Sequence, residues 1–527
     1  MRITDTGLCL LFLLLWMAAD ATARRPCIPK FVGPDAMVCV CNATYCDTLD
    51  PLVLPPKGSF LKYVSSKVGQ RLERSEGKFW PNRRSSGLLY TYNPFVHYQQ
   101  IKGFGGSHTD AAAMNIMQLS PAAQDQLLRA YFSEEGIEYN LLRWPIACSD
   151  FSTHPYTYDD DCLYDYQLKC FSLAQEDLKL RIPLLHRITA LSKRPLSLIA
   201  SPWTAPAWLR TNNDVIGKAK LKGEAGDRYH KTWALYFIRF LDEYARHNIT
   251  FWAITAQNEP VFSVCISQEN FPTTRFSPEE QRDFIIKDLG PALAASSHKN
   301  VRLITLDDLR INLPNWAKVV IGNSTAAQYV AGIGIHWYLD SVVPSGPTLE
   351  ATHFLYPNFF IIYTESCNGF RSWEPKVDLG SWERGVRYSR NIVTNLNSYV
   401  TGWIDWNLAL DMNGGPNWVE NFVDSPIIVN PLKDEFYKQP MFYHLAHFSK
   451  FVPEGSIRVD LTCNSLLGQC QLSIVGFLRP DGVAVVVAHN EHSWDVPFSI
   501  SDDQIGCIEA VARAESIQTF LWKRFCA

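Results

Sequence analysis

The chain has little excess charge of either sign and almost no long hydrophobic runs, and both shortages exclude classes of protein. Its 527 residues carry 49 basic and 53 acidic side chains, a formal net charge of −4. A nucleic-acid partner calls for a basic patch, so we exclude nucleic acid as the main partner. Low-complexity segments, long charge runs and lipidation motifs are also lacking. With 47% hydrophobic residues, the sequence predicts a globular protein with more than one domain.

Only one apolar stretch resembles a targeting segment. Arg2 precedes an apolar run at 8–19, and Ala21-Thr22-Ala23 is typical of a small-residue cleavage site. The run is too short to span a membrane comfortably, and no other stretch is long enough. We therefore expect a signal peptide over 1–23 and a soluble mature protein that is luminal or secreted. Glycosylation sequons, which agree with that compartment, begin at Asn42, Asn248 and Asn323.

The 14 cysteines suit an oxidising compartment. Without Cys9 of the signal peptide their number is odd, so at least one thiol stays free. Disulfide bonds would hold together the short mature N-terminus, through Cys27, Cys39, Cys41 and Cys46. Zinc is the weaker alternative, because the spacing matches no usual pattern and no histidine is near, and we expect no metal or cofactor. Further bonds are plausible for Cys162 with Cys170, Cys463 with Cys470, and Cys507 with Cys526, leaving Cys148, Cys265 and Cys367 free.

A short apolar run followed by an amphipathic helical stretch repeats along the middle of the chain. The eight runs are 101–106, 139–145, 195–202, 251–259, 301–307, 332–338, 359–365 and 399–407. Helical patterns between them include 233–246, 278–289 and 382–396. Strands that alternate with helices imply parallel pairing, and eight such units predict an α/β fold, the (β/α)8 TIM barrel. A doubly wound open sheet is the alternative, although it more usually has five or six strands.

The two ends of the chain have shorter apolar runs, separated by turn signals such as Arg479-Pro480-Asp481-Gly482. These features predict flanking antiparallel β domains built from both chain ends. We expect a small disulfide-bonded β domain from 24–52 plus 407–440. An antiparallel β-sandwich would comprise 53–98 plus 456–527, and the catalytic barrel 99–406 plus 441–455.

Two glutamates end predicted strands of the barrel. Glu259 follows a run at 251–254 in the motif Asn258-Glu259-Pro260, and Glu365 closes the run at 359–365. Catalytic residues of such barrels lie at the carboxyl ends of strands, so the two can face one pocket. Glycosidic cleavage needs two carboxyl groups, about 5 Å apart for retention of configuration and about 6.5 Å or more for inversion. We expect Glu259 to be the acid/base and Glu365 the nucleophile, although composition alone does not assign these roles.

Other strand ends carry aromatic and polar side chains. The chain contains 16 Trp, 22 Tyr and 29 Phe, and rings of this kind stack on the apolar faces of sugars. Each ring alone is more often a core residue than a ligand contact. Their concentration at strand ends nevertheless indicates a sugar pocket, in the segments Cys148-Ser149-Asp150-Phe151, Trp203, His336-Trp337-Tyr338 and Asp405-Trp406-Asn407.

These motifs resemble the glucosylceramidase family of retaining barrel β-glycosidases over essentially the whole mature chain. The matching stretches are CVCNATYCD at 39–47, YFSEEGI at 131–137, SPWT at 201–204, HWYLD at 336–340, DWNLAL at 405–410, GGPNW at 414–418 and NFVDSPIIV at 421–429. The resemblance implies hydrolysis of glucosylceramide to glucose and ceramide in the lysosomal lumen. It also implies a saposin-type activator and peripheral contact with an anionic lipid membrane.

The resemblance also implies roles for individual residues. Asp150, Trp203, Asn258 and Trp406 would hold the glucose, with Asn258 on the 2-hydroxyl, and Arg143 would lie near the nucleophile. Phe151, His336, Tyr338, Asn421 and Phe422 would line the cleft.

Two departures from the family and two alternatives remain. Gln257 replaces a usual Glu, and losing that charge near Glu259 would shift the pH optimum downward. The loop at 261–275 diverges, which leaves the aglycone open. Another β-glycoside, such as a xyloside or steryl glucoside, is therefore one alternative substrate. A non-catalytic sugar- or lipid-binding protein is the other alternative, although such a protein would be expected to have lost a catalytic glutamate.

Overall fold

The computed structural model describes residues 24–81, 87–261, 270–464 and 470–524. The expected signal peptide at 1–23 lies outside these residues, as do Cys9, Cys265 and Cys526. Across the described ranges, no helix is both long enough and apolar enough to cross a membrane.

Eight parallel strands close into a barrel, in agreement with the prediction from the repeated βα pattern. Each of the eight predicted runs overlaps one strand of the barrel. The strands are β6 (Gly103–Ser107), β7 (Leu141–Ile146), β8 (Ser197–Pro202), β9 (Ala253–Thr255), β10 (Arg302–Leu309), β11 (Val330–His336), β12 (Phe360–Glu365) and β13 (Val400–Asn407). Six apolar side chains fill the barrel interior: Leu141, Ile199, Ala253, Ile304, Ile362 and Ile404. Chemistry is therefore confined to the rim, at the strand ends.

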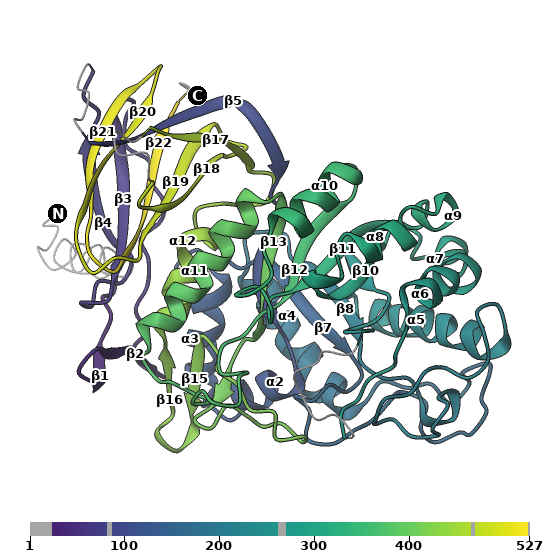
Figure 1. Ribbon diagram of the computed structural model, residues 1–527. Helices are drawn as coiled ribbons and strands as arrows, with labels where there is room; N and C mark the ends of the chain where they lie inside the picture. The colour runs from purple at the N-terminus through teal and green to yellow at the C-terminus, as the bar shows by residue number, and fades with distance from the viewer. Residues whose placement is uncertain (1–23, 82–86, 262–269, 465–469, 525–527) are drawn as a thin grey trace, which may run out of the picture.

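Helices surround the barrel (Figure 1). They are α2 (Asp110–Met117), α3 (Pro121–Phe132), α4 (Ile182–Leu191), α5 (Arg228–Arg246), α6 (Pro278–Phe284), α7 (Gly290–Ala295), α8 (Asn315–Val320), α9 (Ser324–Ala327), α10 (Ala351–Leu355), α11 (Trp382–Asn397) and α12 (Pro440–Ser449). The three helical patterns expected from sequence correspond to α5, α6 with the π-helical turn η4 (Ile285–Leu289), and α11. Local chemistry defines the start of α6, where Ser277 and Glu280 form a capping box and Pro278 occupies the first turn.

Strands from both ends of the chain form a nine-stranded sheet beside the barrel. In Figure 1 purple N-terminal and yellow C-terminal strands interleave there. The strands, in spatial order, are β21 (Gly506–Ala512), β20 (Val496–Asp502), β5 (Leu88–Gln100), β17 (Ile457–Asn464), β18 (Ser473–Leu478), β19 (Val483–Asn490), β22 (Ser516–Lys523), β3 (Ser59–Ser66) and β4 (Glu73–Lys78). Neighbours are antiparallel, as expected, except that β20 pairs with β5 in parallel.

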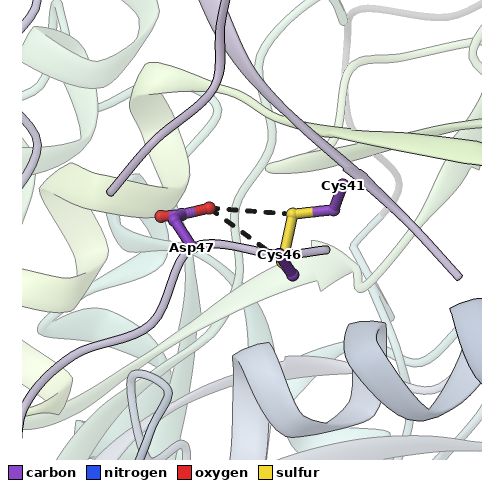
Figure 2. A group of neighbouring side chains, drawn as sticks. All are labelled: Cys41, Cys46 and Asp47. Atoms are coloured by element: carbon purple, nitrogen blue, oxygen red, sulfur yellow. Dashed lines mark hydrogen bonds between the residues drawn. A yellow bond between two sulfur atoms is a disulfide. The ribbon is translucent and has the colours of Figure 1, made fainter. Parts of the chain in front are cut away.

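A second, five-stranded sheet joins the mature N-terminus to the segment that follows β13. Its strands, in spatial order, are β1 (Pro29–Gly33), β2 (Ala36–Asn42), β16 (Glu435–Lys438), β15 (Ile427–Asn430) and β14 (Leu410–Asp411). Asp47 lies next to the Cys41–Cys46 disulfide in this region (Figure 2). Its carboxylate pairs with the ammonium of buried Lys438 at 2.6 Å. The sulfurs are bonded to each other and the carboxylate is paired, so these groups form a structural cluster and not a metal site.

Four disulfide bonds are present in the described residues: Cys27–Cys39, Cys41–Cys46, Cys162–Cys170 and Cys463–Cys470. The expected bond between Cys507 and Cys526 was wrong for Cys507, which is a free thiol. Cys507 is buried on β21, with its sulfur 3.8 Å from a carboxylate oxygen of Glu509. Cys148 and Cys367 are free, as expected, and both are buried.

Candidate active site

Glu259 and Glu365 meet at the rim of the barrel. Glu365 is the last residue of β12, and Glu259 follows β9 by four residues. Carboxylate oxygens of the two, together with a ring nitrogen of His336, lie within 4.8 Å of one another. Oxygens this close agree with the separation of about 5 Å that is typical of carboxyl pairs that retain configuration.

The backbone around Glu259 is unusual. Glu259 has a φ of 43°, and Leu306 and Asp307 on β10 have φ values of 69° and 57°. Non-glycine residues rarely adopt this left-handed region, and where they do they often serve a site. The register of β10 against β11 shifts at the same point, between Leu306 and Asp308. The Glu259 N–H donates to the Asp307 carbonyl at 2.9 Å, so the two irregular segments hold each other in place.

His336, the last residue of β11, lies between Glu259 and Asp307 and contacts both. Its Nδ1 lies 3.0 Å from a carboxylate oxygen of Glu259, and its Nε2 lies 3.0 Å from one of Asp307. Burial alone would lower the pKa of His336, but Glu365, Asp307 and Glu259 together outweigh that effect and raise the pKa to about 10. The ring is therefore an imidazolium that donates from both nitrogens. It has no lone pair to offer a metal, although Glu259, His336 and Glu365 have suitable spacing.

Arg143 and Tyr338 hold the carboxylate of Glu365. One guanidinium nitrogen of Arg143 donates to Glu365 Oε2 at 2.5 Å, and the Tyr338 hydroxyl donates to Oε1 at 2.6 Å. The other terminal nitrogen of Arg143 donates to Asp307 at 2.9 Å and to Asn258 Oδ1 at 2.7 Å. Burial raises the pKa of Glu365, while the positive charges of His336 and Arg143 and the Tyr338 hydroxyl oppose that rise. Arg143 and Tyr338, by their hydrogen bonds, and His336, by its charge, stabilise the charged form of Glu365.

Two indole rings form an aromatic wall beside the carboxylates. Trp203, directly after β8, and Trp406, on β13, stack with centroids 5.3 Å apart and planes 15° apart. The Arg143 guanidinium lies 4.9 Å from the Trp203 ring and 5.5 Å from the Trp406 ring. Such a surface suits the apolar face of a sugar.

Asp150 supplies a third carboxyl group to the same pocket. Its Oδ2 accepts hydrogen bonds from the amides of Asn417 and Asn421, each at 3.0 Å. Burial raises the pKa of Asp150 to about 7, although both amides act in the opposite direction. Asp150 is therefore largely neutral at acidic pH and can donate as well as accept a hydrogen bond.

Most of the residues expected at the site line one pocket. Its wall consists of Asp150, Trp203, Asn258, Glu259, Phe271, Tyr338, Glu365, Cys367, Phe370, Trp406, Asn421 and Val423. Three expected cleft residues lie elsewhere. His336 is fully buried and contacts Glu259 without lining the pocket. Phe151 packs edge-on against Trp406 with ring centroids 5.9 Å apart. Phe422 is half-buried beside Asn421.

Sequence reasoning missed Asp307 and part of the wall. Asp307 closes a predicted strand run, so the strand-end rule that selected the two glutamates also pointed to it. Phe271, Phe370 and Val423 are on irregular segments, where no periodic pattern marks them. A larger hollow of about 860 Å³ lies at the opposite end of the barrel, where the strands begin, but no pair of glutamates lines it.

The expected glycosylation acceptors are on or near the surface. Asn248 is exposed, and Asn42 and Asn323 are half-buried.

The chain matches two domain models of one family. The glycosyl hydrolase family 30 TIM-barrel domain matches residues 101–452, and the glycosyl hydrolase family 30 beta sandwich domain matches residues 455–520.

Similar proteins cover almost the whole chain. Lysosomal acid glucosylceramidase of Mus musculus is 54% identical over 97% of this chain and 98% of its own. Putative glucosylceramidase 4 of Caenorhabditis elegans is 41% identical over 93% of this chain and 94% of its own. The crystal structure of SrfJ from Salmonella typhimurium is 28% identical, with a TM-score of 0.80, and covers 89% of this chain and 100% of its own. The chain therefore belongs to glycosyl hydrolase family 30 and is a glycoside hydrolase homologous to the glucosylceramidases.

Proposed function

We propose that the protein hydrolyses the β-glucosidic bond of glucosylceramide, with retention of configuration, to give glucose and ceramide. The retaining mechanism is supported by the carboxylate oxygens of Glu259 and Glu365, which lie within 4.8 Å of each other. The substrate rests on the 54% identity with the mouse lysosomal acid glucosylceramidase.

Glu365 is the nucleophile in this proposal. Held by Arg143 and Tyr338, its carboxylate attacks the anomeric carbon as the bond to the ceramide oxygen breaks. Glu259 gives its proton to that oxygen, and ceramide leaves. Glu259 then takes a proton from water, the water oxygen attacks the anomeric carbon, and the bond to Glu365 breaks to release glucose.

The wall of the pocket supports the sugar roles expected for Asp150, Trp203, Asn258 and Trp406. The oxygen of Asn258 accepts from Arg143, which leaves its amide nitrogen to donate to the sugar 2-hydroxyl. The positive charges of Arg143 and His336 compensate the negative charges of Asp307 and Glu365, so the proposed mechanism uses no metal ion.

We also infer that the protein works in the lysosomal lumen, at an anionic lipid membrane and with a saposin-type activator. Two large apolar side chains at the pocket end of the barrel support contact with lipid. Val342, after β11, is 73% exposed, and Trp373, after β12, is 78% exposed. The lysosomal location and the activator rest on the similarity to the mouse protein.

Covalent trapping tests the proposal. A 2-fluoro-glucoside or a cyclitol epoxide is expected to label Glu365, as read by peptide mass spectrometry. Glu365→Gln is expected to lose both labelling and turnover, whereas the matched change Glu134→Gln at an exposed site is expected to keep both. Labelling of Glu259 in place of Glu365 would reverse the roles, and no labelling or turnover would favour a non-catalytic binding protein. A panel of β-xylosides, steryl glucosides and glucosylceramide separates the possible substrates.

A further inference from the structure

Gln257 makes a set of hydrogen bonds that its position in the chain does not reveal. It follows β9, it is buried, and it stands two residues before Glu259. Its amide nitrogen lies 3.1 Å from the Pro202 carbonyl oxygen, 2.7 Å from that of Trp203 and 3.1 Å from that of Asn258. The amide orientation follows from these acceptors, because the reverse orientation would bring its oxygen against three carbonyl oxygens.

These bonds join the ends of β8 and β9, where the strand ladder is weak. The two strands pair through only two residue pairs, Ile199 with Ala253 and Ala200 with Ile254. Beyond that ladder, the Asn258 N–H donates to the Pro202 carbonyl at 3.0 Å, and the Thr274 N–H donates to the Trp203 carbonyl at 3.0 Å. The Gln257 amide adds a side-chain contact to three of these carbonyl groups, at the base of Trp203 and Asn258.

We propose that Gln257 is a positioning residue whose non-titrating amide fixes Trp203 and Asn258 for the sugar over a wider pH range than a glutamate would. This inference rests on the proposed β-glucosidase function. A Gln amide donates at every pH. A Glu in the same place donates only when protonated, and once ionised it would face three carbonyl oxygens. Gln257 therefore extends activity toward higher pH.

The surrounding charges already have their own partners. Arg143 bonds to Glu365 and Asp307, and Glu259 bonds to His336. Asp308, after the β10 irregularity, accepts from the N–H groups of Val261 and Leu309. Arg210 donates to the carbonyl of Thr273, beside Thr274.

The hydrogen bonds of Gln257 predict a shift of the pH profile that is opposite to the one predicted from its missing charge. If Gln257 acted only by removing a negative charge, restoring the charge with Gln257→Glu would move the pH optimum upward. If its amide positions Trp203 and Asn258, the same variant would lose activity as its new carboxyl group ionises, so the basic limb would move downward. One substitution therefore separates the two explanations by sign.

The test measures kcat/KM on an aryl β-glucoside as a function of pH. Gln257→Glu is expected to match the wild type within about threefold at the lowest pH, and to fall about tenfold per pH unit once the new carboxyl group ionises. Gln257→Met fills the space without donors, and is expected to lose about tenfold at every pH with no new limb. Gln328→Glu, which adds a charge at an exposed site, is the matched control and is expected to keep the wild-type profile. Rates are normalised to active sites titrated with a 2-fluoro-glucoside, so a partly folded sample still reports its profile.

An unchanged or upward-shifted basic limb in Gln257→Glu would overturn the proposal while the wild type remains active. An inactive, unlabelled wild type would instead refute the proposed function.

Discussion

The hydroxyl of Tyr338 offers a clean perturbation of the nucleophile. It donates to Glu365 Oε1 at 2.6 Å, and Tyr338→Phe removes this oxygen while the ring stays in the pocket wall. A hydrogen bond to a charged group contributes about 1.5–3 kcal/mol. Losing it weakens the charged form of Glu365 by about that amount, so the pKa of Glu365 is expected to rise.

The sign for activity follows from the need for an ionised nucleophile. Burial already raises the pKa of Glu365, so a further rise moves the acidic limb of the kcat/KM profile to higher pH. The profile of the variant is compared with that of the wild type, because interacting groups share their apparent pKa values. The assay is hydrolysis of an aryl β-glucoside between about pH 3 and 8. Tyr164→Phe, at a 58% exposed side chain, is the matched control. An acidic limb that stays in place in Tyr338→Phe would show that the hydroxyl does not stabilise the Glu365 carboxylate.

Two further predictions concern stability. Arg143→Met removes the guanidinium that pairs with both buried Asp307 and Glu365. It is expected to lower the free energy of unfolding by about 3–5 kcal/mol, as measured by urea denaturation. A loss of less than about 1 kcal/mol would contradict this. Burial lowers the pKa of His447 to about 3. Below about pH 6.5 this histidine therefore binds a proton in the unfolded chain but stays neutral in the folded chain. His447 thus costs the folded state about 2–3 kcal/mol between pH 6.5 and 4.5, and His447→Gln is expected to flatten the fall in stability over that window; parallel curves for variant and wild type would argue against it.

The barrel and the catalytic pair could be predicted from the sequence because both depend on patterns among residues that are close together in the chain. Each strand of the barrel is a short apolar run, Glu365 ends one such strand, and Glu259 follows another by four residues. The protonation of His336 was not accessible, because it depends on carboxylates from three other strand ends that meet only when the barrel closes. The same holds for the parallel pairing of β20 with β5, since alternating patterns mark a strand but not the direction of its neighbour. The left-handed turn at Asp307 had no signal either, because neither Leu306 nor Asp307 is a glycine.

The five-stranded sheet also has a consequence for how the protein is made. Strand β2 pairs with β16, and Asp47 pairs with Lys438, which follows it by 391 residues. At a synthesis rate of about 5–20 residues per second, the N-terminal strand waits roughly 20–80 s for its partner. During this interval one edge of β2 is unpaired, and an unpaired edge is a template for pairing with another chain. Chaperone demand is therefore expected to include the first strands made, which keep an unpaired edge until β16 is synthesised.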